Sequence, residues 1–131
     1  MQFGYTIIYV PDVSQALDYF NRAFGLPTKM LHETGLYGEL ETGQTTLAFA
    51  GEMLAYMNYP KGHLSPHASD VPLGIEIALV CDDVPAAHAK ALAEGGTELA
   101  PPQDKPWGQV VSYVQTPERI VVELCTPIKP A

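Results

Sequence analysis

Two glutamates stand inside runs of apolar residues that have the length of β-strands. Glu76 lies within residues 74–81 and Glu123 within residues 120–125. A carboxylate that loses water without gaining a partner is costly, so each should raise its pKa, find a hydrogen-bond donor or share a proton with the other. Such a pair could act as a general base toward a bound carbonyl compound. It could equally hold a cationic or amine-bearing ligand.

Both glutamates also have a purely structural interpretation. Glu123 could be held by the hydroxyl groups of Tyr5 or Tyr9, and the sequence favours neither this role nor a functional one. For Glu76 the sequence leans toward function, because its charge interrupts an otherwise apolar run.

The only tryptophan of the chain lies just before another strand-like run. Trp107 is followed by Gly108 and Gln109, which indicates a position at the mouth of any cavity that the strand helps to form. A rigid aromatic ring there could stack on a flat ligand or a cation, with Gln109 as a polar contact. The alternative is a ring that plugs the end of a barrel.

The elements that must position these residues can be traced through the first half of the chain. Residues 4–10 are rich in tyrosine, isoleucine and valine and predict a strand. A helix is expected next, capped by Asp12 or Ser14 and ended by Gly25. Turn signals then separate three predicted strands, which are residues 28–33, 37–41 and 45–50.

The second half follows a long connection. Residues 51–73 contain three prolines and weak periodicity, which predicts a connection with one helical turn at residues 52–57. A strand is expected over residues 74–81 and a helix between Asp82-Asp83 and Gly95-Gly96. The three strands predicted after it are residues 97–100, 109–115 and 120–125.

The two halves match each other in sequence. A shift of 71 residues places Tyr5 on Glu76, Asp12 on Asp83 and Gly25 on Gly96. Each half holds one helix and about four strands, too little to bury a sheet alone. We therefore expect an α+β fold of two tandem βαβββ units that form a cup-shaped, partly closed mixed β-sheet with the helices outside. The predicted boundaries within one domain, 1–131, are 1–50 and 74–131 for the units and 51–73 for the connection.

Alternation along the strands predicts the lining of this cup. If Glu76 and Glu123 face inward, the lining is apolar and aromatic with two acids at its centre. These two are the candidate catalytic residues if the protein is an enzyme. The candidate ligand-binding residues are Tyr5, Tyr9, Ala48, Trp107, Gln109 and Tyr113.

The composition narrows the classes of partner. The chain has 131 residues with 7 basic and 15 acidic side chains, a net charge of −8. This charge disfavours nucleic acids and anionic membranes, which need a basic footprint, and we expect neither as a partner. No apolar run approaches the roughly 18 residues of a membrane span, and no signal peptide is evident. The two cysteines lie in apolar runs, which favours a reducing, cytoplasmic location.

Three segments resemble a known family. The run YTIIYVPDVSQALDYFNRAFGL, and later GIEIALVCDDVPAAHAKALAEGG and KPWGQVVSYVQTPERIVVELCTP, are similar to the two units of the vicinal-oxygen-chelate superfamily. That group includes glyoxalase I, extradiol dioxygenases and bleomycin-resistance proteins. The resemblance covers nearly the whole chain apart from residues 51–73. It implies a cup of strands with the site inside, and frequent homodimers.

The resemblance also implies where a metal would bind. In metal-dependent members the ligands come from the first and fourth strand of each unit, and these positions fall on Tyr5, Ala48, Glu76 and Glu123. Only the two glutamates could ligate Ni, Zn, Mn or Fe here, whereas three or four ligands are usual. The histidines, His32, His63, His67 and His88, are not placed to complete the set. We therefore expect a degraded metal site and no cofactor, with Glu76 and Glu123 as the ligands if a metal does bind.

Two functions follow from the resemblance, and the sequence does not decide whether the protein is an enzyme. The first is a glyoxalase/bleomycin-resistance-like protein that binds a small organic molecule, cationic or aromatic, in the β-cup. The alternative is a metal-dependent lyase or dioxygenase that acts on a substrate with vicinal oxygens. In both cases the partners we expect are a small-molecule ligand and a second copy of the chain.

Overall fold

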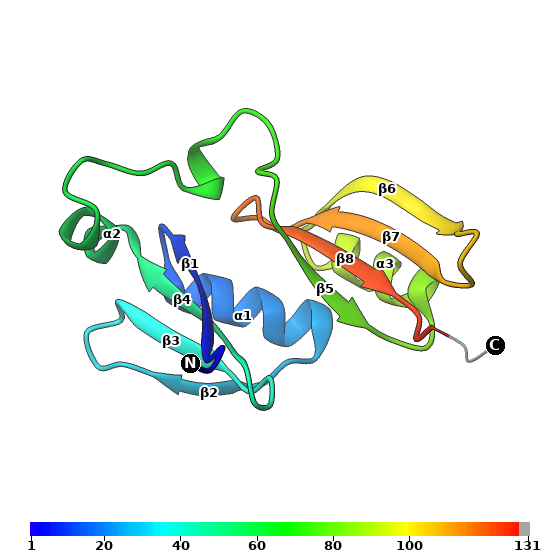
Figure 1. Cartoon of the computed structure of the whole chain (residues 1–131), viewed down its shortest axis with the longest axis horizontal. Coiled ribbons are helices and arrows are strands. Elements are labelled where there is room, and N and C mark those ends of the chain that lie inside the picture. Colours follow the sequence, from blue (N-terminus) through cyan, green and yellow to red (C-terminus); the bar gives the residue numbers. More distant parts are fainter. Residues whose placement is uncertain (129–131) are drawn as a thin grey trace. The chain divides into compact units, whose positions relative to one another are not determined.

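The same order of elements, one strand, one helix and three further strands, occurs in each half of the structure. It is a computed structural model that describes residues 1–128, and the chain divides into two compact units, Met1–Asp70 and Val71–Ala131 (Figure 1). The first unit contains β1 (Tyr5–Val10), α1 (Val13–Phe24), β2 (Thr28–Leu31), β3 (Tyr37–Leu40), β4 (Thr46–Gly51), α2 (Glu52–Asn58) and the 3-10 turn η1 (Pro66–Ala68). The second contains β5 (Glu76–Val80), α3 (Val84–Ala93), β6 (Thr97–Asp104), β7 (Val110–Gln115) and β8 (Val121–Cys125).

Each unit has its own four-stranded mixed sheet. The strand orders are β1-β4-β3-β2 and β5-β8-β7-β6. The first and last strands of each unit pair in parallel, and the other pairs are antiparallel. This confirms the predicted α+β class and the two tandem βαβββ units. Neither sheet closes into a barrel, in agreement with a partly closed cup.

Local signals fix the ends of both helices between strands. The Asp12 carboxylate accepts from the backbone N–H of Gln15 at 3.0 Å, and Asp83 does the same for Ala86. Gly25 ends α1 with φ 69°, a left-handed conformation that a side chain would disfavour. The caps expected from the sequence at Asp12 and Gly25 are therefore confirmed.

In each unit the helix covers one face of the sheet. Phe20 of α1 packs on Phe49 of β4 with ring centroids 5.1 Å apart. In the second unit His88 of α3 is 5% exposed, and its Nδ1 and Nε2 lie 2.9 Å from Ser112 Oγ and 3.1 Å from Glu98 Oε1. His88 is thus on the helix-covered side, as expected, but it is a buried structural residue. The opposite face of each sheet holds the candidate site.

Each strand differs from its predicted bounds by at least one residue, and the ends of β2 and β6 change where side chains lie. β2 ends at Leu31, so His32 lies in the following turn, where its Nδ1 contacts Thr34 Oγ1 at 2.8 Å. β6 continues to Asp104 instead of ending at residue 100, because its two prolines lie on an edge strand, where a missing N–H breaks few ladder bonds.

The predicted helical turn after β4 is confirmed as α2. Within residues 1–128, none of the helices is long and apolar enough to cross a membrane.

Candidate functional site

The open face of the second unit, which we call the acidic face, brings three candidate residues together. Strand register places Ala78, Glu123 and Tyr113 side by side on β5, β8 and β7. Glu76 lies in the next row, beside Val121. Because residues two apart on a strand share a face, Glu76, Glu123 and Tyr113 all point away from α3.

The two glutamates of the acidic face interact directly. The pKa of Glu76 is raised above its ordinary value by burial, by the negative charge of Glu123 and by a hydrogen bond with the Glu123 side chain. Since Glu76 is still an exposed residue, the neighbouring carboxylate is the cause that the geometry explains best. When protonated, Glu76 can donate to the Glu123 carboxylate, so the pair can share a proton.

Glu123 also accepts a hydrogen bond from the adjacent strand. The Tyr113 hydroxyl donates to Glu123 Oε1 at 2.9 Å. This bond, together with burial and the charges of Glu123 and Glu76, raises the pKa of Tyr113 to about 12. The sequence left open Tyr5 or Tyr9 as donors to Glu123, and the observed donor is Tyr113, which belongs to the same sheet.

The cysteine of the acidic face is not activated. Cys125 is 4% exposed, and burial and the nearby Glu123 raise the pKa of its thiol. A thiol with a raised pKa is a poor nucleophile near neutral pH, so Cys125 contributes apolar surface rather than chemistry.

The open face of the first unit has a different acid, which sequence reasoning missed. Ala48 of β4 lies beside Ile7 of β1 and Glu39 of β3. The Tyr37 hydroxyl donates to Glu39 Oε2 at 2.7 Å. Burial, followed by the bond to Glu39, raises the pKa of Tyr37 above its ordinary value. The sequence signal that could have revealed this acid is the alternation of Tyr37 and Glu39 along β3, which puts both side chains on the face opposite α1.

Each open face thus holds a tyrosine–glutamate pair, but on different strands. Where β7 and β8 carry Tyr113 and Glu123, the matching positions of β3 and β4 carry Glu39 and Ala48. The carboxylate of the first unit is thus on the third strand of its unit, whereas that of the second unit is on the fourth. Tyr5, at the other end of the same face, borders an open pocket of about 410 Å³ with polar walls.

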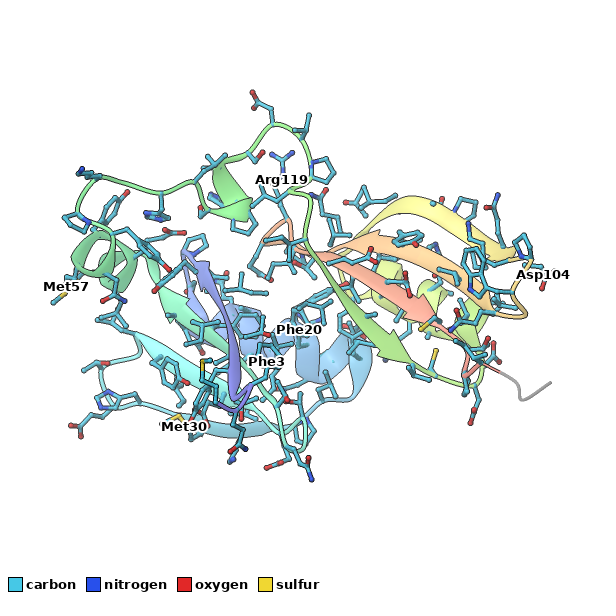
Figure 2. All side chains as sticks on the ribbon, viewed as in Figure 1. Phe3, Phe20, Met30, Met57, Asp104 and Arg119 are labelled. Atoms are coloured by element: carbon cyan, nitrogen blue, oxygen red, sulfur yellow. The ribbon has the colours of Figure 1, made fainter. Side chains whose placement is uncertain are left out.

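Trp107 and Gln109 lie at the turn between β6 and β7, the end of the sheet marked by Asp104 in Figure 2. The Trp107 indole N–H donates to Gln109 Oε1 at 2.7 Å, and Gln109 Nε2 donates to the Thr126 carbonyl at 2.8 Å. Trp107 is 59% exposed. Gln109 is four residues from Tyr113 on β7, about 13 Å along the strand. The ring therefore stands beyond the glutamate pair rather than against it.

Tyr9 contacts residues of the connection, 51–73. Its ring lies 5.7 Å from Tyr59 and 6.0 Å from His63, and its hydroxyl accepts from Asn58 Nδ2 at 3.0 Å. The connection, which sequence reasoning treated as a spacer, thus packs on the first unit.

The residues present do not fit the four-ligand metal centre implied by the resemblance. Ala48 has no ligating atom, and Tyr5 offers only a phenol, on a side chain that is 57% exposed. Glu76 and Glu123 are occupied with each other and with Tyr113. Over residues 1–128 no group of three or more histidine, cysteine, aspartate and glutamate side chains could hold a metal ion. No mechanistic step is therefore assigned to a metal.

Comparisons with known proteins agree with this architecture. A glyoxalase-related enzyme from Fulvimarina pelagi superposes with a TM-score of 0.81 at 15% identity, covering 97% of this chain and 88% of that one. A glyoxalase/bleomycin resistance protein/dioxygenase family enzyme from Burkholderia phytofirmans PsJN gives 0.79 at 18% identity, covering 96% and 98%. TioX from Micromonospora sp. ML1 gives 0.70 at 19% identity, also covering 96% and 98%.

At these identities the structural likeness shows the fold alone. A comparison with curated proteins found no match. The model of one sequence family, however, matches residues 2–124, nearly the whole chain. The chain therefore belongs to the glyoxalase/bleomycin resistance protein/dioxygenase superfamily.

Proposed function

We propose that this protein binds a small organic cation, such as an amine, on the acidic face. The observation that carries the proposal is the Glu76–Glu123 pair, which strand register places in adjacent rows of one face and whose side chains interact. A bound ammonium group would lie between the two carboxylates and donate to both. It would replace the repulsion between two like charges by two charge-assisted hydrogen bonds.

The surroundings of the pair support an organic rather than an inorganic cation. Ala78 and Val80 share the face with Glu76, and Val80 is 64% exposed. An apolar group attached to the ammonium would remove this surface from water, which contributes about 25 cal/mol per Å². Tyr113 holds Glu123 in place from the other side, so part of the site is ordered before the ligand arrives.

Calorimetric titration with benzylamine, present as its ammonium ion at pH 7, tests this proposal. Glu123→Gln and Glu76→Gln should each weaken binding about tenfold, since each removes one charge-assisted contact worth about 1.4 kcal/mol. Glu33→Gln is the matched control, because it removes the same charge from an exposed turn after β2. Equal affinities for all four proteins would contradict the proposal.

The metal-dependent alternative has one observation in its favour, namely two adjacent carboxylates beside a phenol. The same titration, with Zn²⁺, Ni²⁺, Mn²⁺ or Fe²⁺ in place of benzylamine, distinguishes this alternative from the cation-binding proposal. Stoichiometric metal binding that Glu76→Gln abolishes would replace the cation-binding proposal with a metalloenzyme of the lyase or dioxygenase class. The homodimer and the cytoplasmic location stay predictions.

A further inference from the structure

A second group of polar and aromatic side chains lies in the first unit, apart from the acidic face. It is built by α2 and the connection that follows it. Glu52 is the first residue of α2, and its Oε2 lies 2.6 Å from His63 Nε2. Both side chains are largely buried, with 24% and 13% of their surface exposed. The imidazole N–H donates to the carboxylate, so the pair ties the connection to the start of the helix.

Three tyrosine rings lie beside this imidazole, and two of them, Tyr56 and Tyr59, are exposed to solvent. Tyr56 of α2 lies 5.2 Å from His63 in an edge-on arrangement, Tyr9 of β1 lies 6.0 Å away, and Tyr59 lies 6.3 Å away. Tyr9 and Tyr59 also touch each other edge to face at 5.7 Å. Several aromatic rings together with one carboxylate make up the chemistry that binds organic cations, because ring faces and the carboxylate all attract positive charge. We call Tyr9, Tyr56, Tyr59 and Glu52 the tyrosine box.

Two buried atoms of this group make no hydrogen bond to the residues that the structure describes. They are Glu52 Oε1 and His63 Nδ1. A buried acceptor without a donor destabilises the folded state. The arrangement is therefore not the best one for stability alone, and Glu52 retains a carboxylate oxygen whose negative charge a bound cation could balance.

A tight turn presents His63 to the box. The N–H of Gly62 donates to the Tyr59 carbonyl at 2.8 Å, and Gly62 adopts φ 99°, which is open to glycine but strained for other residues. His63 thus lies on a short loop rather than on a helix or strand. Such a loop can withdraw one side chain without disturbing β1 or α2.

We propose that the tyrosine box is a second binding site, for a small quaternary ammonium or imidazolium ion, and that the His63 side chain occupies it as a built-in competitor. A cation that enters displaces His63 and takes its place beside Glu52 and the three rings. The charge of Glu52 and the ring faces attract a quaternary ammonium ion, and an imidazolium ion can also donate to Glu52. The inference does not depend on the acidic face, since none of its residues is shared.

The test uses tetramethylammonium chloride, with sodium chloride at equal ionic strength as the salt control. The parent protein is the double variant E76Q/E123Q, so that any binding at the acidic face is weakened beforehand. Chemical shifts of ¹³C-labelled tyrosine rings report occupancy of the box. In this parent, His63→Ala should tighten tetramethylammonium binding at least tenfold, and adding Glu52→Gln should reverse the gain.

His67→Ala is the matched control, because it removes an exposed imidazole four residues further along the same connection. It should leave the affinity of the parent unchanged. A His63→Ala protein that binds no tighter than His67→Ala would overturn the proposal. If His63→Ala does not fold, the imidazole resonances of His63 in the parent decide the matter: they must shift as tetramethylammonium is added, and constant resonances exclude displacement.

Discussion

Tyr113 and Glu123 face each other across the antiparallel strands β7 and β8, and the Tyr113 hydroxyl donates to Glu123 Oε1 at 2.9 Å. This bond fixes one carboxylate of the acidic face while Glu76, in the next row, remains exposed. One acid is therefore held in place and the other is free to exchange its proton. That asymmetry supports the proposal that the pair binds a cation from solvent.

Removing the tyrosine hydroxyl should destabilise the second unit. Tyr113→Phe leaves Glu123 without its donor, and we expect the free energy of unfolding to fall by about 1 kcal/mol, the typical worth of such a bond. Urea unfolding followed by the fluorescence of Trp107, the only tryptophan, measures this change. Tyr5→Phe is the control, since Tyr5 is 57% exposed. Equal losses in the two variants would show that the bond contributes nothing specific.

The ionisation of Tyr113 should depend on its partner. Its pKa is about 12, chiefly because the neutral phenol donates to Glu123. In Glu123→Gln the negative charge is gone, so the pKa should fall toward the ordinary value of about 10. A pH titration of the Tyr113 ring carbon by NMR detects the shift. An unchanged pKa would mean that burial, not Glu123, sets it.

Glu76 should make stability decrease with rising pH. Its pKa is raised in the folded protein, so its contribution is fully present below the unfolded pKa of about 4.3 and is lost as pH rises through the folded value. Glu76→Gln keeps a donor for Glu123 without the charge. It should match the wild type at pH 3 and exceed it by about 0.5 kcal/mol at pH 7, the size expected for exposed charges.

Urea unfolding of the two proteins at several pH values checks this trend. Glu33→Gln, in an exposed turn, should show no comparable rise between pH 3 and pH 7. A gain of Glu76→Gln that is independent of pH would refute the shared proton.

The parts of the fold predicted from sequence rest on local physics. The Asp12 cap and the Gly25 stop of α1 depend only on residues within a turn of the helix end, and both were predicted. The placement of Glu76 and Glu123 on one face follows from the two-residue period of strands and from the internal repeat.

The parts that were missed depend on register or on irregular chain. The Tyr113–Glu123 bond requires the pairing of β7 with β8 in one register, which turn geometry and packing decide. The Tyr37–Glu39 bond joins two residues of one strand, and the alternation along β3 was the signal that was overlooked. The Glu52–His63 pair spans 11 residues of a connection without periodicity. No local signal in the sequence connects two such residues.

The close approach of α1 to β3 requires a glycine. A Cβ on Gly38 would lie 2.6 Å from Leu17 Cδ1 and 3.2 Å from Val13 Cγ1. Gly38→Ala should therefore destabilise the first unit by about 1 kcal/mol, since overpacking outweighs the gain in strand propensity. Urea unfolding followed by far-UV circular dichroism measures the loss. Gly4→Ala, where a Cβ meets nothing within 4 Å, should be neutral, and a neutral Gly38→Ala would show that α1 can shift.

Gln109 should determine how Trp107 takes part in ligand binding. Its side chain accepts from the indole and is itself held by the Thr126 carbonyl, so it orients a ring that is otherwise exposed. Gln109→Ala frees the ring, and the fluorescence anisotropy of Trp107 should fall. Because Gln109, which holds the ring, lies about 13 Å along the strand from Tyr113, the ring can reach the distal part of an extended ligand but not an ammonium group at the glutamate pair.

Two ligands of different length distinguish an effect of Gln109 on Trp107 from an effect of Gln109 on the glutamate pair. The affinity for methylammonium, which is too small to span the face, should be the same in Gln109→Ala and the wild type. The affinity for an extended aromatic ammonium ion should fall about threefold, which corresponds to the roughly 0.6 kcal/mol of an exposed cation–π or stacking contact. Equal losses for both ligands would mean that Gln109 supports the glutamates through the sheet, and no loss for either would place Trp107 outside the site.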